Sequence, residues 1–117
     1  MSPRRGDRVA PPPGPDEWDV IFGTNEAGKG WDELCTQATT NTRHAWQLMR
    51  TSPDPTPTTS RHHPLKGAYS TGTYRGRRLP QWQIEVTGSG RIWYLIDAER
   101  HRVVVMYASP GHPRATD

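Results

Sequence analysis

The sequence predicts an α+β domain, with two N-terminal helices on one face of a twisted antiparallel β-sheet in the order β-α-α-β-β-β. Two patterns favour this class. Apolar residues recur every three or four positions between residues 27 and 49, as in helices that cover a core, and they alternate with polar residues between residues 79 and 97, as in strands with one buried face. With 117 residues and no internal repeat, the chain is expected to form one small domain over residues 17–115.

The N-terminal region divides into a tail and a strand. Residues 1–16 contain five prolines and three arginines, a composition typical of a disordered tail that solubilises the chain or contacts nucleic acid. Residues 18–22 are short and rich in apolar side chains, which predicts the first strand.

The helical pattern runs from Ala27 to Met49 and is interrupted once. The stretch Thr39-Thr40-Asn41-Thr42 is unfavourable inside a helix, because these side chains hydrogen-bond to the backbone and favour helix starts. The sequence therefore predicts two helices joined near Thr40. Their common buried stripe comprises Ala27, Trp31, Leu34, Cys35, Ala38, Thr42, Ala45, Trp46 and Met49.

Proline dominates the segment after the helices. Residues 51–64 contain four prolines, which lack the N–H that helices and sheet interiors require, so a long surface loop is expected there. Long loops in small domains are often functional. Residues 65–78 are expected to form an irregular, arginine-bearing arm, and Pro80 to precede the first strand of a β-meander.

The meander is expected to separate into an apolar face and a polar face. If Gly88-Ser89-Gly90 is a three-residue hairpin loop, Thr87 faces Arg91, Glu85 faces Trp93 and Gln83 faces Leu95. The last strand is expected over residues 102–108, with Tyr107 on the core side. The core face collects Trp82, Ile84, Val86, Ile92, Tyr94 and Ile96, and the opposite face carries Glu85, Arg91 and Trp93.

The charges are unevenly distributed along the chain. Residues 58–117 hold nine Arg and Lys against four Asp and Glu, and eight of the nine cations are arginine, which suits forked recognition of phosphate. RNA is the expected ligand, with a solvated basic surface as the alternative. The candidate RNA-binding residues are Trp93, Lys66, Arg75, Arg77, Arg78 and Arg114.

Several classes of protein are excluded by the composition. No apolar run approaches the roughly 18 residues of a membrane span, and no signal-peptide segment precedes the domain. Cys35 is the only cysteine, so no internal disulfide forms, and the histidines lack metal-ligand spacing. The sequence predicts a cytoplasmic protein with no metal and no cofactor.

The succession of motifs resembles the RelE/ParE toxin superfamily over about residues 18–115. The motifs are Trp31-x-x-Leu34, Ser52-Pro53, Pro64-Leu65-Lys66-Gly67, a hairpin ending in Gly90-Arg91-Ile92-Trp93-Tyr94, and a terminal His112 region. The resemblance is closest to ribonucleases of the RelE, YoeB and HigB type. It implies a RelE-like fold and a small bacterial toxin that is neutralised by a cognate antitoxin. It further implies a metal-independent endoribonuclease that cuts mRNA in the ribosomal A site.

The resemblance also implies residue roles. Arg91 matches an arginine that contacts the reacting phosphate, His112 a C-terminal histidine that acts as general acid or base, and His63 the place of a carboxylate base. The chain departs from the RelE pattern in two respects. Gln83 and Glu85 replace lysines of the first hairpin strand, and Pro113 follows His112 where a tyrosine is common. The mechanism is therefore expected to rely on histidine.

Metal-independent RNA cleavage needs a base for the 2′-hydroxyl, a cation for the charge on phosphorus and an acid for the 5′-oxygen. His63, His112 and Glu85 are the candidates for proton transfer, and Arg91 for charge stabilisation. Trp93 is expected to stack an unpaired base or to pack against the antitoxin.

Simpler interpretations stay open for each candidate. His63 and His112 are also compatible with solvated polar positions, Glu85 with a surface sheet pair and Arg91 with a surface hairpin arginine. Two other functions compete with RNA cleavage. One is a ParE-like toxin that inhibits gyrase without a catalytic site, and the other is a non-catalytic RNA-binding module on the same fold.

Overall fold

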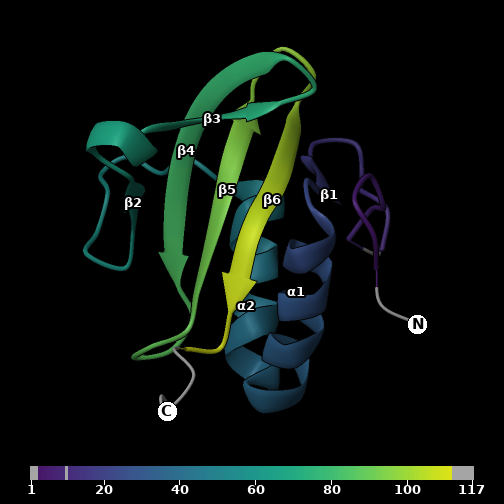
Figure 1. The fold of residues 1–117 in the computed structure, drawn as a ribbon, viewed down its shortest axis with the longest axis vertical. Helices are drawn as coiled ribbons and strands as arrows, with labels where there is room; N and C mark the ends of the chain where they lie inside the picture. The colour runs from purple at the N-terminus through teal and green to yellow at the C-terminus, as the bar shows by residue number, and fades with distance from the viewer. Residues whose placement is uncertain (1–2, 10, 112–117) are drawn as a thin grey trace.

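The computed structural model describes residues 3–9 and 11–111. It confirms the α+β class, because two helices lie on one side of a six-stranded sheet (Figure 1). No helix among the described residues is both long and apolar enough to cross a membrane. The elements are β1 (Asp19–Phe22), α1 (Asn25–Gln37), α2 (Thr39–Thr51), β2 (His62–Pro64), a 3-10 turn (Gly67–Tyr69), β3 (Thr71–Tyr74), β4 (Arg77–Glu85), β5 (Arg91–Asp97) and β6 (Arg102–Ser109).

The sheet has the strand order β1-β6-β5-β4-β2, and β3 pairs with β4 outside this path. The antiparallel meander β4–β5–β6 is as predicted, but β1 pairs with β6 in parallel. The expectation of a purely antiparallel sheet is therefore wrong at β1. Apolar periodicity shows which face of a strand is buried and carries no information on its neighbour or direction.

The helices divide close to the predicted place, at Ala38. Thr24 caps α1, since its hydroxyl oxygen accepts a hydrogen bond from the Ala27 N–H at 2.9 Å. The expected threonine cap of α2 is absent. Thr39 and Thr42 instead donate their hydroxyls backwards, to the carbonyls of Cys35 and Leu34, and so satisfy the end of α1.

The helices cover the predicted core face. Ile84, Val86, Ile92, Tyr94 and Ile96 are buried against α1 and α2, with Trp82 partly buried beside them. A Cβ added to Gly30 on α1 would lie 1.7 Å from the carbonyl oxygen of Ala108. The α1 backbone therefore rests directly on β6.

Part of the N-terminal segment differs from the expected disordered tail. Residues 4–9, here called the N-terminal arm, run antiparallel along the outer edge of β1. Gly6 N–H donates to the Phe22 carbonyl at 2.7 Å, and Phe22 N–H donates to the Asp7 carbonyl at 2.9 Å. Val9 is buried. The arm satisfies a sheet edge that would otherwise expose its backbone groups.

Two further segments are more regular than predicted. β2 lies inside the expected loop and pairs with β4 at the sheet edge, where prolines are tolerated. Residues 71–85, expected to be irregular up to residue 78, form a hairpin of β3 and β4 that contains Pro80 itself. Its turn is Arg75-Gly76, and both residues have positive φ (51° and 79°), as in a type I′ turn.

The β3–β4 hairpin folds over part of the sheet face that the helices leave uncovered, and Figure 1 shows β3 crossing the sheet there. A second apolar cluster forms beneath it. A Cβ added to Gly72 would lie 2.8 Å from the Leu95 Cδ2 atom, so glycine allows this close crossing. The cluster comprises Ile21, Tyr74, Leu79, Leu95 and Val104.

The hairpin register differs from the prediction by two residues. Glu85 pairs with Arg91 and Gln83 with Trp93. β4 ends at Glu85 and β5 begins at Arg91, and in the connection between them Val86 N–H and Thr87 N–H both donate to the Gly90 carbonyl. Since the shift is an even number of residues, the predicted division between the two faces is retained.

A β-bulge changes the last strand. Trp93 pairs with Tyr107 but Tyr94 pairs with Val105, so Met106 is an extra residue on β6. The extra residue reverses the alternation, and Tyr107 points away from the helices and is 42% exposed. The prediction of a core-facing Tyr107 is therefore wrong.

Candidate functional site on the open face of the sheet

Four strands contribute to the part of the sheet that neither the helices nor the β3–β4 hairpin covers. We call it the open face. Register pairs place His63, Gln83, Trp93 and Tyr107 in one row across β2, β4, β5 and β6. The neighbouring row contains Glu85, Arg91 and Ser109. The structure thus brings together four predicted site residues, namely His63, Glu85, Arg91 and Trp93.

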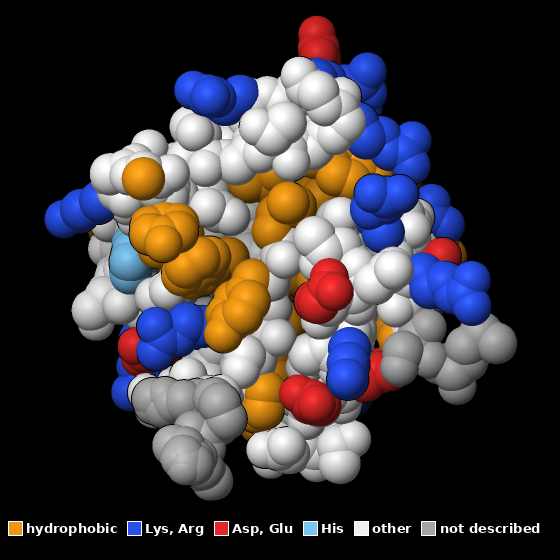
Figure 2. Space-filling model, viewed as in Figure 1, with side chains coloured by type: hydrophobic (Ala, Val, Ile, Leu, Met, Phe, Trp, Pro, Cys, Tyr) orange, Lys and Arg blue, Asp and Glu red, His pale blue; other side chains and the backbone are white. Residues whose placement is uncertain are grey.

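Three aromatic side chains cross the open face. We call Tyr69, Trp93 and Tyr107 the aromatic row. The Tyr69 and Trp93 rings lie 5.3 Å apart, as do those of Trp93 and Tyr107, and the two tyrosines are 60% and 42% exposed. Figure 2 shows hydrophobic side chains running diagonally across this face, with Lys and Arg around its margin. Exposed aromatics in contact with one another are typical of binding surfaces.

Two buried glutamines fix the aromatic row. Trp93 Nε1–H donates to Gln83 Oε1 at 2.7 Å, and Gln81 Nε2–H donates to the Tyr69 carbonyl at 2.8 Å. Gln81 and Gln83 are 7% and 9% exposed. Gln83 thus orients the indole of Trp93.

Arg91 lies at the margin of the aromatic row, opposite Glu85 on the neighbouring strand. No ion pair joins it to another residue within the described ranges. Glu85 is its register partner, but the Glu85 carboxylate lies closest to Arg61, with Oε1 3.8 Å from Nε. A guanidinium without an ion-pair partner can bind an anionic ligand by donating hydrogen bonds to it.

His63 has a defined tautomer. Its Nδ1 lies 2.9 Å from the Pro64 carbonyl, which can only accept a hydrogen bond, so Nδ1 carries the proton in the neutral ring. Nε2 then holds the lone pair and can act as a base.

The other predicted RNA-binding residues lie elsewhere. Lys66 is exposed before the 3-10 turn, whereas Arg75, Arg77 and Arg78 lie at the far end of β4. β4 has nine residues, so at about 3.3 Å per residue Arg77 is roughly 26 Å from Glu85 along the strand. His112 and Arg114 lie outside the described residues.

Arg77 has a structural role. It donates to the carboxylate of Asp97, which is fully buried, at 2.6 Å and also to Glu99 at 2.9 Å. Burial alone raises the pKa of Asp97, but hydrogen bonds from Arg77 and the Arg100 backbone and the charges of Arg77 and Arg102 bring that pKa below its ordinary value. Arg77 is thus committed to an internal ion pair, while Arg75 and Arg78 stay exposed.

Sequence reasoning missed two members of the aromatic row. Tyr69 precedes a strand that was not predicted, and Tyr107 follows a bulge that has no signature in the sequence. The Tyr-Arg-Gly-Arg stretch at residues 74–77 was a usable signal for the β3–β4 turn, because glycine at the second turn position is typical of type I′.

Within the described ranges, no group of three or more His, Cys, Asp or Glu side chains is placed to hold a metal ion. Comparison of the chain with protein-family models, curated proteins and solved structures found no match.

Proposed function

We propose that this chain is a cytoplasmic RelE-type toxin, a metal-independent endoribonuclease that cleaves mRNA and is restrained by a cognate antitoxin. The aromatic row beside Arg91, which forms no ion pair with any described residue, is the observation that carries this proposal. The fold and the family resemblance are secondary support, because neither determines a function by itself.

The open face suits single-stranded RNA. Unpaired bases stack on aromatic side chains, which contributes about 1–3 kcal/mol per base, and arginine binds the phosphates between them. Trp93 is half-buried between two more exposed tyrosines, so the row offers a rigid platform. Such a platform is tolerant of sequence because every base has a π face.

Cleavage in this proposal is a transfer within one RNA strand. The 2′-oxygen attacks the adjacent phosphorus, the bond from phosphorus to the 5′-oxygen breaks, and the products are a 2′,3′-cyclic phosphate and a 5′-hydroxyl. Arg91 stabilises the extra negative charge of the transition state, as donors in oxyanion holes do.

Glu85 and His63 are the described residues that can move protons beside Arg91. Glu85 is the register partner of Arg91, and His63 lies on β2, two strands from Arg91 on the same open face, with its Nε2 lone pair available. One takes the proton of the 2′-hydroxyl and the other, or His112, delivers a proton to the leaving 5′-oxygen.

The same surface explains how an antitoxin would neutralise the toxin. Exposed aromatics beside an arginine are favoured anchors in protein interfaces. An antitoxin segment that covers Tyr69 and Tyr107 would exclude RNA from the open face. Acidic residues in that segment would complement the basic C-terminal half of the chain.

A second candidate function is RNA binding without cleavage. It is favoured by Gln81 and Gln83, whose amides hydrogen-bond to the aromatic row. Because amide side chains do not exchange protons as acids or bases, few groups on the open face can transfer a proton. This candidate shares the RNA surface and differs only in chemistry.

RNA cleavage by the purified chain tests the proposal, with 5′-labelled single-stranded RNA in EDTA and, in parallel, mRNA on translating ribosomes. We expect fragments with cyclic phosphate and 5′-hydroxyl ends. Arg91→Ala should lower the rate about 10²–10³-fold, by analogy with the loss of an oxyanion donor. Arg78→Ala is the matched control, an exposed arginine at the other end of the sheet, and should cleave as wild type.

Other outcomes point to the competing functions. RNA binding without any cleavage would support the second candidate. If expression of the chain in bacterial cells arrested growth while mRNA stayed intact, and Arg91→Ala had the same effect, a ParE-like gyrase inhibitor would be indicated.

A further inference from the structure

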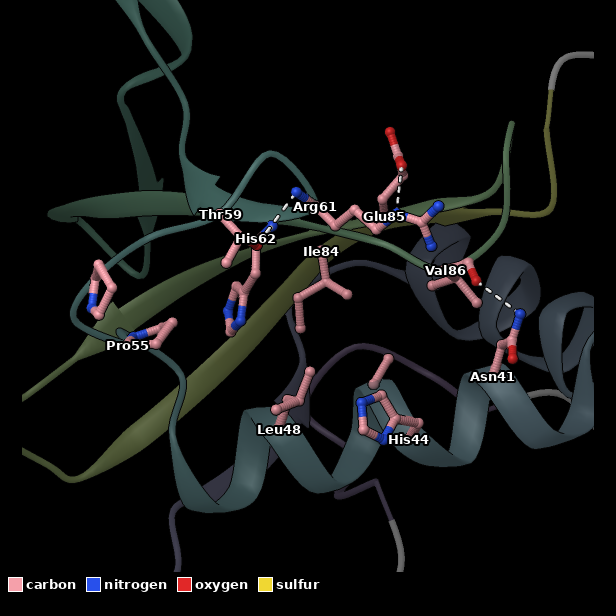
Figure 3. Close-up of a pocket in the computed structure, with 12 residues that line it drawn as sticks. Asn41, His44, Leu48, Pro55, Thr59, Arg61, His62, Ile84, Glu85 and Val86 are labelled. Carbon is pink, nitrogen blue, oxygen red and sulfur yellow. Dashed lines mark hydrogen bonds and ion pairs between the residues drawn. The ribbon is translucent and has the colours of Figure 1, made fainter.

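A pocket of about 410 Å³ lies between α2, the end of β4 and the proline-rich loop, on the helix side of the sheet (Figure 3). Its volume is in the range of about 300–1,000 Å³ that small-molecule sites occupy. The lining residues of this pocket, here called the edge pocket, include Asn41, His44, Leu48, Arg61, His62 and Ile84.

The walls of the edge pocket are apolar on opposite sides. Figure 3 shows Leu48 projecting from α2 towards Ile84 near the end of β4, with Val86 just beyond the strand. Pro55 closes one end. Two apolar walls facing each other suit a flat ring inserted between them.

His62 supplies a hydrogen-bond acceptor whose tautomer is fixed by its neighbours. The Tyr94 hydroxyl donates to the Pro53 carbonyl at 2.5 Å, so the proton between His62 and Tyr94 belongs to His62 Nε2, 2.5 Å from the Tyr94 oxygen. The His62 Nδ1 atom keeps its lone pair and has no hydrogen-bond partner among the described residues. Burial lowers the pKa of His62, which keeps the ring neutral.

The remaining polar groups add acceptors and one strong donor. Asn41 Nδ2–H donates to the Val86 carbonyl at 3.0 Å, which leaves the Asn41 Oδ1 atom as an acceptor. Glu85 is among the lining residues, and the Arg61 guanidinium, whose Nε lies 3.8 Å from Glu85 Oε1, is a donor. A phosphate would meet these acceptors unfavourably, whereas a base with an amino group, ring nitrogens and flat faces matches them.

The edge pocket adjoins the candidate site through Glu85. This residue lines the pocket and is the register partner of Arg91 on the open face, a pairing that places Cβ atoms about 5 Å apart. A nucleotide beside a phosphate at Arg91 therefore has a short path around the sheet edge.

We propose that the edge pocket binds one unpaired, amino-bearing nucleobase of the RNA strand that lies on the open face. This inference rests on the proposed RNA function and adds a specific contact to an otherwise sequence-tolerant platform. His62 accepts a hydrogen bond from the amino group of the base, and the apolar walls contact its faces.

The test uses a 2′-O-methyl RNA oligonucleotide, which cannot be cleaved, with a single 2-aminopurine placed at each position in turn. We expect fluorescence enhancement at one position, where the base leaves its stacked neighbours and enters the pocket. Replacing that 2-aminopurine by purine, which lacks the amino group, should weaken binding several-fold. In the wild-type protein, the His62 imidazole nitrogens should shift in NMR spectra on addition of the same oligonucleotide.

A pocket-filling variant provides the comparison. His44→Trp extends an indole from an exposed position of α2 into the pocket and should abolish the enhancement and weaken binding about tenfold. Gln47→Trp, on the same helix but outside the pocket, should bind as wild type. Tight oligonucleotide binding with no fluorescence enhancement at any position would overturn the pocket assignment alone. The same conclusion would follow if His44→Trp bound the oligonucleotide as tightly as wild type and the His62 resonances of the wild type did not shift. No oligonucleotide binding by the wild type would overturn the proposed RNA function with it.

Discussion

At the scale of single residues, Gly30 is the position where the fold leaves least room. Its missing side chain lets α1 rest on the β6 backbone, and an added Cβ would lie 1.7 Å from the Ala108 oxygen. Neither partner can yield without moving a helix or a central strand, since both contacts involve backbone.

Gly30→Ala is therefore expected to lower the free energy of unfolding by about 1–3 kcal/mol or more. Urea unfolding followed by circular dichroism measures this change. Gly88→Ala is the matched control, because a Cβ there meets nothing within 4 Å, and it should stay within about 0.5 kcal/mol of wild type. Equal stability of the two variants would contradict the close contact between α1 and β6.

His62 predicts how stability depends on pH. Burial keeps the pKa of His62 below its ordinary value, so the unfolded chain binds a proton at a pH where the folded chain does not. The free energy of unfolding should thus fall as the pH drops below about 6.5, the ordinary pKa of histidine. Ionised Asp97 also stabilises the fold, because its pKa is lower in the folded chain than in the unfolded chain. This stabilisation decreases only as the pH falls below the ordinary pKa of a carboxylate.

His62→Gln keeps an N–H donor near Tyr94 and Pro53 but cannot titrate. The variant should show a flatter profile of unfolding free energy between about pH 7 and pH 5. His44→Gln, an exchange at an exposed helix position, should retain the wild-type slope. A slope that is the same in all three proteins would show that His62 protonation does not oppose folding.

At the scale of elements, the sequence predicted what depends on local periodicity. The two helices, the β4–β5–β6 meander and its buried face follow from residue spacing alone. The parallel β1–β6 pair and the arm on β1 depend on contacts between distant segments, and no local pattern records them.

The candidate site divides in the same way. Glu85, Arg91 and Trp93 were placed on one face correctly, because face alternation survives an even register shift. Tyr107 was misplaced, since one bulge residue reverses alternation. Arg77 was expected at the RNA surface, but the buried Asp97 that binds it becomes its neighbour only through strand pairing.

The N-terminal arm gives a prediction at this scale. Val9→Asp places a carboxylate where a buried valine packs and should release the arm from β1. The Phe22 amide, which donates to Asp7 of the arm, should then exchange with solvent at least about tenfold faster, the ratio that a loss of 1.4 kcal/mol produces.

Hydrogen exchange followed by NMR provides an internal control for this variant. The Gly23 amide donates to Val105 of β6 and should keep its wild-type protection. Parallel loss of protection at both amides would indicate global destabilisation, and unchanged exchange at Phe22 would show that the arm does not protect β1.

At the scale of the whole molecule, Arg91 and the pair Arg75 and Arg78 lie at opposite ends of β4 and its neighbours. Arg91 borders the aromatic row, whereas Arg75 and Arg78 lie at the β3–β4 turn, roughly 26 Å away along a nine-residue strand. A single-stranded ligand on the aromatic row reaches Arg91 first, so the two groups should differ in their effect on binding.

Salt dependence distinguishes the two ends. Affinity for single-stranded RNA should fall as salt rises, with a logarithmic slope of about −0.7 for each phosphate contacted. Arg91→Gln should make the slope shallower by about 0.7, and Arg78→Gln should leave it unchanged for a short oligonucleotide. Fluorescence anisotropy at several salt concentrations measures both slopes, and equal slopes for Arg91→Gln and wild type would remove Arg91 from the phosphate contacts.

The bulge at Met106 links the two sides of the sheet. Because of this inserted residue, Ala108 faces the helices, where only a small side chain and Gly30 can meet, and Tyr107 faces outward to join Trp93. If Met106 were paired regularly instead, the two would exchange faces, which would place a tyrosine against α1 and remove one ring from the surface. Deleting Met106 would make β6 regular and keep Val105, Tyr107 and Ala108 opposite Tyr94, Trp93 and Ile92. Helix docking and surface chemistry are therefore coupled through the bulge, and a chain without Met106 should retain both the contact of α1 with Ala108 and the outward Tyr107 ring.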